Sequence, residues 1–386
     1  MRTIGIVTVA RSDYGILTPL IERVHNDPDL NLSLYVTGMH LEEAYGHSID
    51  DIIADGFPIA EAVDIKENSD TPEGIAATMG RATVAFAEVF ARKKPDILVV
   101  LGDRFEMHAA CMATIPFLIP VAHICGGSVT IGAIDDVFRH SVTKVSHLHF
   151  AETQGHADRI IQMGEEPWRV MVSGSISIDN LARIDTLTFE ELRAELKLPS
   201  PQPPLLVTYH PVTREYQDTE RQISNLLKAL HQLDQPVVFT YPNSDTSTSI
   251  IIKHITDYVA RHEKAVAFTN LGTRRYLNLM RHARAMVGNS SSGIMESPSF
   301  RLPIVNIGTR QEGRTHANNV IHCGYETDDI IAATTRALSD TFRASIAGLE
   351  TFFGDGHAAE RITECLKTIP LDERLLRKQF YTPKPG

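Results

Sequence analysis

A short segment of small hydroxyl residues has the composition of a phosphate-binding loop. Residues 287–293 have the sequence VGNSSSG, and Glu296 follows three residues later. The apolar run at 283–287 predicts a buried strand that leads into a helix. Backbone N–H groups at a helix N-terminus and serine hydroxyls both donate hydrogen bonds to an anion, and a carboxylate one turn later can accept two from a ribose diol. An ordinary helix capped by serine has the same local pattern, so the loop alone leaves both interpretations open.

Titratable residues follow other apolar runs in the same way. Arg11, Asp103 and His210 each stand at or just after the end of such a run, and Asp135 and Asp136 form a pair. Paired carboxylates can raise each other's pKa and supply an acid or a base near neutrality. Each residue also has an ordinary structural interpretation, as a helix cap, a surface charge or a buried imidazole.

Two further segments bear on ligand chemistry. Residues 308–314, GTRQEGR, place Arg310 and a second arginine next to the proposed phosphate loop, a composition that suits a nucleotide base or a diphosphate. His147 and His149 share a predicted strand face, a spacing that metal sites sometimes use. No third ligand with clear spacing accompanies them, so we expect no metal site.

The elements that must position these residues form a strand–helix alternation. Apolar segments rich in Val and Ile predict parallel strands buried on both faces. They lie at 5–10, 32–38, 97–103, 120–126, 147–152 and 170–174, and then at 205–209, 237–241, 265–269, 285–288 and 303–308. Helical periodicity appears at 71–94, 220–233, 249–261, 274–282 and 328–338. The proline-rich segment 196–204 predicts a linker or the entry to a second domain. The simplest architecture is two doubly wound α/β units, which bind ligands beyond the carboxyl ends of their strands.

The composition of the chain indicates which binding partners and which cellular location to expect. The chain has 386 residues and a net charge of −11, which argues against a nucleic-acid or anionic-membrane surface. The four cysteines have no disulfide-like spacing, and no run resembles a signal peptide or a membrane span. We therefore expect a cytoplasmic protein.

Several motifs together resemble one family. They are VTVARSDYG at 7–15, VLGDRFE at 100–106, GAIDD at 132–136, RHSVTKVSHLHF at 139–150, HPVT at 210–213, GNSSSGIMESPSF at 288–300 and NIGTRQEGR at 306–314. In this order they are similar to the hydrolysing UDP-N-acetylglucosamine 2-epimerases of sialic-acid and related nonulosonic-acid biosynthesis. The resemblance runs from the first strand to about residue 365.

The resemblance implies a GT-B-like fold with two Rossmann-type domains and a cleft between them. We expect an N-terminal domain over 1–180, a UDP-binding domain over 181–365 and a tail over 366–386. In the implied reaction, UDP leaves a UDP-sugar by anti elimination, and water adds to the resulting 2-acetamidoglucal to give N-acetylmannosamine. The resemblance implies no metal, nicotinamide or other cofactor, and we expect a homo-oligomer.

The family's functional positions map onto individual residues of this sequence. Those matching substrate-binding positions are Ser290 and Ser291 for the diphosphate, Glu296 for the ribose, Arg310 near the uracil and Arg11 near the phosphates. Those matching catalytic positions are Asp103, Asp135 and His210.

One loop departs from the family. The family carries a glutamate at the position of Cys125 or of Ser128, whereas this chain has HICGGS at 123–128. Three alternatives therefore stay open: an epimerase for a modified sugar such as UDP-N,N′-diacetylbacillosamine, a GT-B glycosyltransferase, and a catalytically weak nucleotide-sugar-binding protein. The missing carboxylate favours the last of these.

Overall fold

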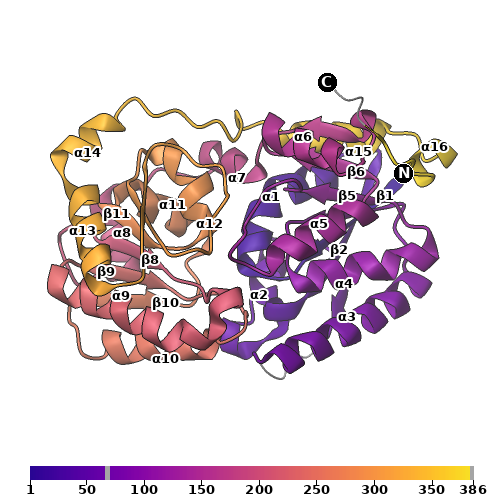
Figure 1. The fold of residues 1–386 in the computed structure, drawn as a ribbon. Coiled ribbons are helices and arrows are strands. Elements are labelled where there is room, and N and C mark those ends of the chain that lie inside the picture. The colour runs from indigo at the N-terminus through magenta and orange to yellow at the C-terminus, as the bar shows by residue number, and fades with distance from the viewer. Residues whose placement is uncertain (66–69, 383–386) are drawn as a thin grey trace. The chain divides into compact units, whose positions relative to one another are not determined.

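A computed structural model describes residues 1–65 and 70–382, which divide into two compact units (Figure 1). The first unit comprises Met1–Ser128, Asp135–Arg183 and Phe352–Gly386. The second comprises Val129–Ile134 and Ile184–Thr351.

The described residues of the first unit form a parallel sheet of seven strands in the order β3-β2-β1-β4-β5-β6-β7. The strands are β1 (Arg2–Thr8), β2 (Leu30–Thr37), β3 (Ile59–Val63), β4 (Ile97–Leu101), β5 (Val121–Ile124), β6 (Leu148–Ala151) and β7 (Val170–Val172). Every residue of β4, β5 and β6 is buried, as parallel strands covered on both faces require.

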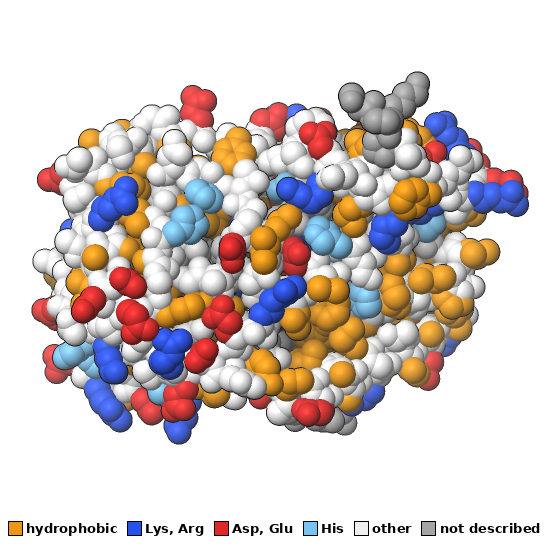
Figure 2. Space-filling view, viewed as in Figure 1, with side chains coloured by type: hydrophobic (Ala, Val, Ile, Leu, Met, Phe, Trp, Pro, Cys, Tyr) orange, Lys and Arg blue, Asp and Glu red, His pale blue; other side chains and the backbone are white. Residues whose placement is uncertain are grey.

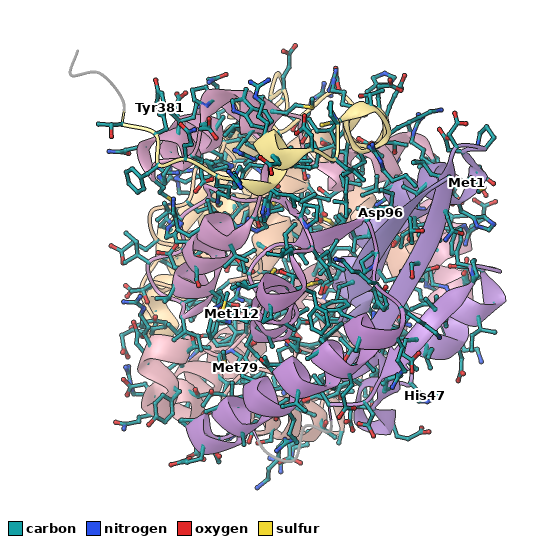
Figure 3. The ribbon with its side chains drawn as sticks, turned by 90° about the vertical axis from the view of Figure 1, so that its right-hand side faces the viewer. Met1, His47, Met79, Asp96, Met112 and Tyr381 are labelled. Carbon is teal, nitrogen blue, oxygen red and sulfur yellow. The ribbon has the colours of Figure 1, made fainter. Side chains whose placement is uncertain are left out.

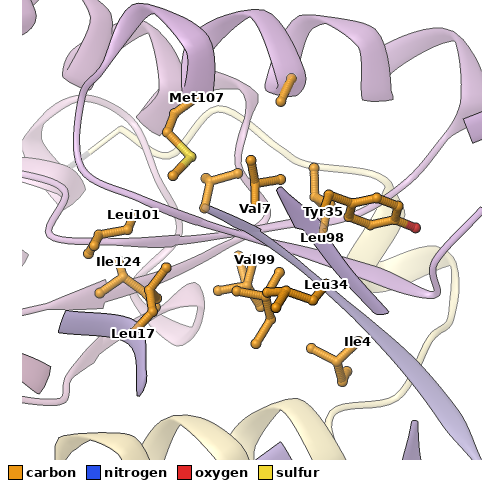
Figure 4. Packing of buried hydrophobic residues seen from close by; sticks show 14 of the residues in the cluster. Ile4, Val7, Leu17, Leu34, Tyr35, Leu98, Val99, Leu101, Met107 and Ile124 are labelled. Atoms are coloured by element: carbon orange, nitrogen blue, oxygen red, sulfur yellow. The ribbon is translucent and has the colours of Figure 1, made fainter. Parts of the chain in front are cut away.

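Helices cover both faces of this sheet. They are α1 (Arg11–Asn26), α2 (Ile49–Ala54), α3 (Pro72–Arg92), α4 (Phe105–Thr114), α5 (Asp135–Val145), α6 (Gln154–Gln162), α7 (Ile176–Asp179), α15 (Ala358–Thr368) and α16 (Glu373–Leu376). α3, which carries Met79, packs against α4, which carries Met112, while α1 packs against α15 (Figure 3). Buried side chains such as Val99 and Met107 fill the space between sheet and helices (Figure 4).

The second unit repeats the design. Among its described residues the strand order is β10-β9-β8-β11-β12-β13, again parallel. The strands are β8 (Leu205–Thr208), β9 (Val237–Thr240), β10 (Ala265–Phe268), β11 (Ala285–Gly288), β12 (Ile304–Ile307) and β13 (Val320–Cys323). The helices are α8 (Phe189–Leu196), α9 (Thr219–Leu233), α10 (Thr248–Val259), α11 (Gly272–His282), α12 (Ser291–Met295), α13 (Thr327–Leu338) and α14 (Asp340–Ser345). The predicted fold class of two doubly wound units is confirmed.

The strand order reverses once in each sheet, between β1 and β4 and between β8 and β11. Ligands of doubly wound sheets bind at such a point, beyond the carboxyl ends of the strands. Arg11 and Asp103 follow β1 and β4, while His210 and Ser290 follow β8 and β11. Both switch points therefore carry residues that the sequence analysis selected.

The domain boundaries need correction. The second domain does not run to residue 365, and residues 366–386 are not a separate tail, because α15 and α16 belong to the first unit. The Asp179 carboxylate, itself buried, accepts hydrogen bonds from the N–H groups of Ala358 at 3.1 Å and Ala359 at 2.7 Å, which ties the start of α15 to α7. The proline-rich segment 196–204 is likewise no linker between units, because it lies inside the second one.

Two strands were not predicted. β3 is an edge strand with mostly half-exposed residues, and β13 has only four residues, with an exposed histidine inside it. Neither has the continuous apolar run that identifies a buried strand.

Acidic and basic side chains are interspersed over the second unit on the face shown in Figure 2. Within residues 1–65 and 70–382, no helix combines the length and hydropathy needed to cross a bilayer.

Replacing Asp179 by alanine should destabilise the first unit by about 2 kcal/mol, because two N–H groups at the start of α15 lose a charged acceptor. Thermal unfolding measures this effect. Glu364→Ala, an exposed position on α15, is the matched control and should change stability by less than about 0.5 kcal/mol. Equal unfolding midpoints for the two variants would contradict the assigned role of Asp179.

Candidate functional site

The loop after β11 is fixed by a glycine and an asparagine. Gly288 has a φ of +142°, and a Cβ atom there would lie 2.0 Å from the carbonyl oxygen of Thr208. The side chain of Asn289 accepts a hydrogen bond from the N–H of His210 at 2.7 Å and donates one to its carbonyl at 2.8 Å. These bonds join the ends of β8 and β11, so His210 lies beside the serine loop.

Hydroxyl groups gather at the start of α12. The Oγ atoms of Ser290 and Ser292 lie 3.1 Å apart, and the Tyr276 hydroxyl lies 2.5 Å from Ser292 Oγ. Burial raises the pKa of Tyr276, and the nearby Glu296 charge raises it further, so this phenol remains a hydrogen-bond donor at neutral pH. Ser290 makes no side-chain capping hydrogen bond to α12, and Ser291 is the first residue of that helix. Donors at the helix start therefore remain for another acceptor.

The structure corrects one detail of the predicted helix. α12 has only five residues, so Glu296 is its C-terminal cap and not a residue within a longer helix. The Glu296 side chain is buried, at the far end of this short helix from Ser290.

The loop at 308–314 packs directly on the serine loop. Arg310 Nη1 and Gln311 Nε2 both donate to the carbonyl oxygen of Asn289, at 3.0 and 2.8 Å. Residues 129–134 join the same unit, because the N–H of Ile131 donates to the Glu312 carbonyl at 3.0 Å. In the second unit the structure thus brings together four predicted residues (Ser290, Ser291, Arg310 and His210) around Asn289.

His210 has an acidic neighbour. Its Nδ1 lies 3.9 Å from the carboxylate of Asp245, and both side chains are buried. The pair therefore places an imidazole, which can accept and donate protons, beside a carboxylate at the end of β8.

Arg139 organises the acidic residues of the first unit. Its guanidinium, 2% exposed, forms an ion pair with Asp103 and donates from Nη1 to Asp136 Oδ1 at 3.1 Å. The same Nη1 donates to the Ser128 carbonyl at 3.1 Å. Asp135 is the first residue of α5, directly before Asp136. Arg139 thus connects the end of β4, the loop after β5 and the start of α5.

Arg11 follows β1, the strand that pairs with β4. It is the first residue of α1, and its Nη1 donates to the carbonyl of Tyr45 at 3.2 Å. Asp13, in the first turn of the same helix, was not selected from the sequence. Burial raises the pKa of Asp13 to about 7, although the nearby Arg104 lowers it.

The loop after β5 contains a buried imidazole and a thiol. His123 Nε2 donates to the Gly102 carbonyl at 2.8 Å, and burial lowers the pKa of His123 to about 3, so this histidine is neutral and structural. Cys125 donates to Oε1 of Glu152 at 3.2 Å. Sequence reasoning missed Glu152, because its partner is 27 residues away and is a cysteine.

The two histidines considered for a metal have other partners. His149 Nε2 donates to Glu165 at 3.1 Å, and His147 Nδ1 accepts from the N–H of Val121 at 3.2 Å. Residues 1–65 and 70–382 contain no group of three or more His, Cys, Asp or Glu side chains with the arrangement of a metal site.

Comparisons with known proteins agree on one family. A family model described as UDP-N-acetylglucosamine 2-epimerase matches residues 22–367. The chain is 36% identical to GDP/UDP-N,N′-diacetylbacillosamine 2-epimerase (hydrolyzing) of Campylobacter jejuni, over 98% of each chain. It is 33% identical to UDP-N,N′-diacetylbacillosamine 2-epimerase (hydrolyzing) of Legionella pneumophila, over 98% of this chain and 99% of that one.

Among solved structures, the co-structure of S. aureus MnaA with UDP superposes with a TM-score of 0.79. The sequence identity is 19%, over 95% of this chain and 96% of the other. This likeness establishes a shared two-domain Rossmann-type fold.

Replacing Arg139 by methionine should destabilise the first unit by about 3–5 kcal/mol, because carboxylates at the end of β4 and the start of α5 lose a buried partner. Arg23→Met is the control. The Arg23 pair with Glu360 is exposed on both sides, so its loss should cost less than about 1 kcal/mol. Chemical denaturation of both variants gives the comparison, and an Arg139→Met protein as stable as Arg23→Met would contradict the organising role of Arg139.

Proposed function

Because the chain belongs to the UDP-N-acetylglucosamine 2-epimerase family, we propose that it is a hydrolysing 2-epimerase of a UDP-activated 2-acetamido sugar. The main support for a modified sugar is that the relatives in Campylobacter jejuni and Legionella pneumophila, which match nearly the whole chain, are named for N,N′-diacetylbacillosamine. UDP-N,N′-diacetylbacillosamine is therefore the first candidate substrate. UDP-N-acetylglucosamine, with N-acetylmannosamine as product, is the second, and the description of the family model supports it.

We propose that the nucleotide binds to the second unit. Ser290, Ser291 and the first N–H groups of α12 would hold the diphosphate, since a helix start and hydroxyl groups both favour an anion. Glu296 would accept hydrogen bonds from the ribose. Arg310 would lie near the uracil, a placement supported by its hydrogen bond to Asn289 in the serine loop.

The proposed reaction has two steps. A base removes the proton from C2, its electron pair forms the C1–C2 double bond, and the C1–O bond to the diphosphate breaks with its electrons leaving on UDP. Water then adds its oxygen to C1, while C2 receives a proton on the opposite face. The net change is UDP-sugar plus water to free 2-epimeric sugar plus UDP.

The catalytic roles fall to Asp103, Asp135 and His210, with Arg11 near the phosphates. The ion pair with Arg139 holds the carboxylate of Asp103 at the end of β4, where it would act as a hydrogen-bond acceptor or base. His210, beside Asp245, would donate a hydrogen bond to the leaving diphosphate. We also propose a cytoplasmic location and a homo-oligomeric state, and no metal or cofactor has a role in these steps.

The purified protein should release UDP from UDP-N,N′-diacetylbacillosamine with a kcat/KM at least about tenfold above that for UDP-N-acetylglucosamine, because the pocket would contact the acetamido group that replaces a hydroxyl. Both reactions can be followed by proton NMR, with and without EDTA, and chelation should leave the rates unchanged. A higher kcat/KM for UDP-N-acetylglucosamine would select the second candidate. Transfer of the sugar to an acceptor without free sugar would contradict the proposal and favour a glycosyltransferase.

Ser291→Ala should weaken UDP binding about tenfold, because a hydrogen bond to a charged phosphate contributes about 1.5–3 kcal/mol. Isothermal calorimetry with UDP measures the affinity directly. Ser345→Ala, an exposed serine on α14 of the same unit, is the matched control and should bind UDP as the native protein does. Unchanged affinity in Ser291→Ala would place the diphosphate elsewhere.

A further inference from the structure

Cys125 and Glu152 meet at the carboxyl ends of two neighbouring strands. β5 and β6 pair in parallel, with Ile124 opposite Phe150, and the N–H of Cys125 continues the pairing by donating to the Phe150 carbonyl at 3.1 Å. Cys125 then turns into the left-handed region with a φ of +67°. Its Sγ donates to Oε1 of Glu152 at 3.2 Å.

Glu152 is deeply buried for an acidic residue. Its side chain is 1% exposed, and Nδ1 of His156, one turn into α6, lies 3.5 Å from Oε2. Taking a carboxylate out of water carries a large free-energy penalty unless its partners compensate for lost hydration. A buried carboxylate at the carboxyl ends of the strands, where such sheets bind ligands, is therefore a candidate acid–base residue.

His156 presents a ring nitrogen to the Glu152 carboxylate. Nδ1 of His156 is buried and has no hydrogen-bond partner within the described part of the chain. An imidazole that carries its proton on Nε2 presents Nδ1 as an acceptor. Nδ1 can then receive a hydrogen bond from the Glu152 carboxyl once that group has taken up a proton.

The loop containing Cys125 is held firmly against α6 and Arg139. At Gly127, φ is +77° and a Cβ atom would lie 2.2 Å from the His156 carbonyl oxygen, so only glycine permits this approach. Arg159 donates to the Gly127 carbonyl, and Arg139, the partner of Asp103, donates to the Ser128 carbonyl. The thiol is thus fixed relative to the acidic residues of the same unit.

We propose that Cys125 and Glu152 form a proton relay for the reaction at C2 of the sugar, an inference that rests on the proposed function. Cys125 is partly exposed whereas Glu152 is enclosed, so the thiol is the group that contacts the substrate. As the C2–H bond breaks, its proton passes to Sγ, the thiol proton passes to Oε1, and the C2 electron pair forms the C1–C2 double bond as UDP departs. Glu152, which directly follows the neighbouring strand β6, thus supplies the carboxylate that the HICGGS loop at 123–128 lacks.

Turnover of Glu152→Gln and Cys125→Ala tests the relay. Each should lower kcat about a hundredfold or more, the usual effect of losing an acid–base group, while KM stays within about threefold. The double variant should be no slower than either single variant, because the two groups act as a unit. Cys125→Glu introduced into Glu152→Gln should raise the rate again, since it places a carboxylate at the thiol position.

Glu165→Gln is the matched control, because Glu165 is another buried glutamate of the first unit that bonds a histidine, His149. Its kcat should equal that of the native protein even if its stability falls. Thermal unfolding identifies any variant that fails to fold. In that case Cys125→Gly, which also lacks a side-chain proton and permits the left-handed backbone at this position, replaces Cys125→Ala and should show the same loss of kcat.

Thiol alkylation gives a readout independent of turnover. A neighbouring carboxylate disfavours the thiolate, so iodoacetamide should modify Cys125 faster in Glu152→Gln than in the native protein, as followed by peptide mass spectrometry. Native kcat in both Glu152→Gln and Cys125→Ala would overturn the relay alone. A native protein that releases no UDP from either sugar would overturn the proposed function, and the relay with it.

Discussion

The charged side chain of Arg139 is almost fully buried, and the hydrogen-bond partners that it requires determine how three segments of the first unit are arranged. A desolvated guanidinium is stable only when carboxylates and carbonyls surround it. Asp103, Asp136 and the Ser128 carbonyl meet this need, and they come from three different segments of the chain. The electrostatic requirement of one residue therefore fixes the acidic groups at the end of β4 and the start of α5, together with the loop after β5. The same contacts hold the loop from which Cys125 reaches Glu152.

In the second unit, an uncharged residue, Asn289, holds the loops after the strands together. Asn289 satisfies both backbone groups of His210 through its side chain, and its carbonyl accepts from Arg310 and Gln311. The close approach of Gly288 to Thr208 makes this arrangement possible, because any Cβ atom there would separate β11 from β8. The proposed diphosphate loop is thus held by backbone recognition, which leaves the serine hydroxyls and the start of α12 for a ligand.

Much of the fold follows from the sequence because buried parallel strands have a distinctive apolar composition. The strands at β4, β8 and β11 and the helix α3, capped by Thr71 through the N–H of Gly74, lie close to where the sequence places them. The return of α15 to the first unit depends on hydrogen bonds from the N–H groups of Ala358 and Ala359 to the Asp179 carboxylate. These partners lie far apart in the sequence, so no local sequence pattern predicts the contact. Candidate site residues that directly follow strands, such as Asp103 and Ser290, could be selected from the apolar runs that precede them. Arg139, Asp13 and Glu152 could not, because their importance comes from burial and from partners distant in sequence.

We propose that UDP leaves by elimination across C1 and C2. C2 loses its proton in this step and receives another one when water adds, so the product carries a C2 hydrogen from solvent. Incubation of the native protein with its UDP-sugar in D2O, followed by proton NMR of the released sugar, measures this exchange directly. Elimination followed by water addition predicts deuterium at C2 of every product molecule and inverted configuration at that carbon. Free sugar released with its original C2 proton would show simple cleavage at C1 and would contradict the account.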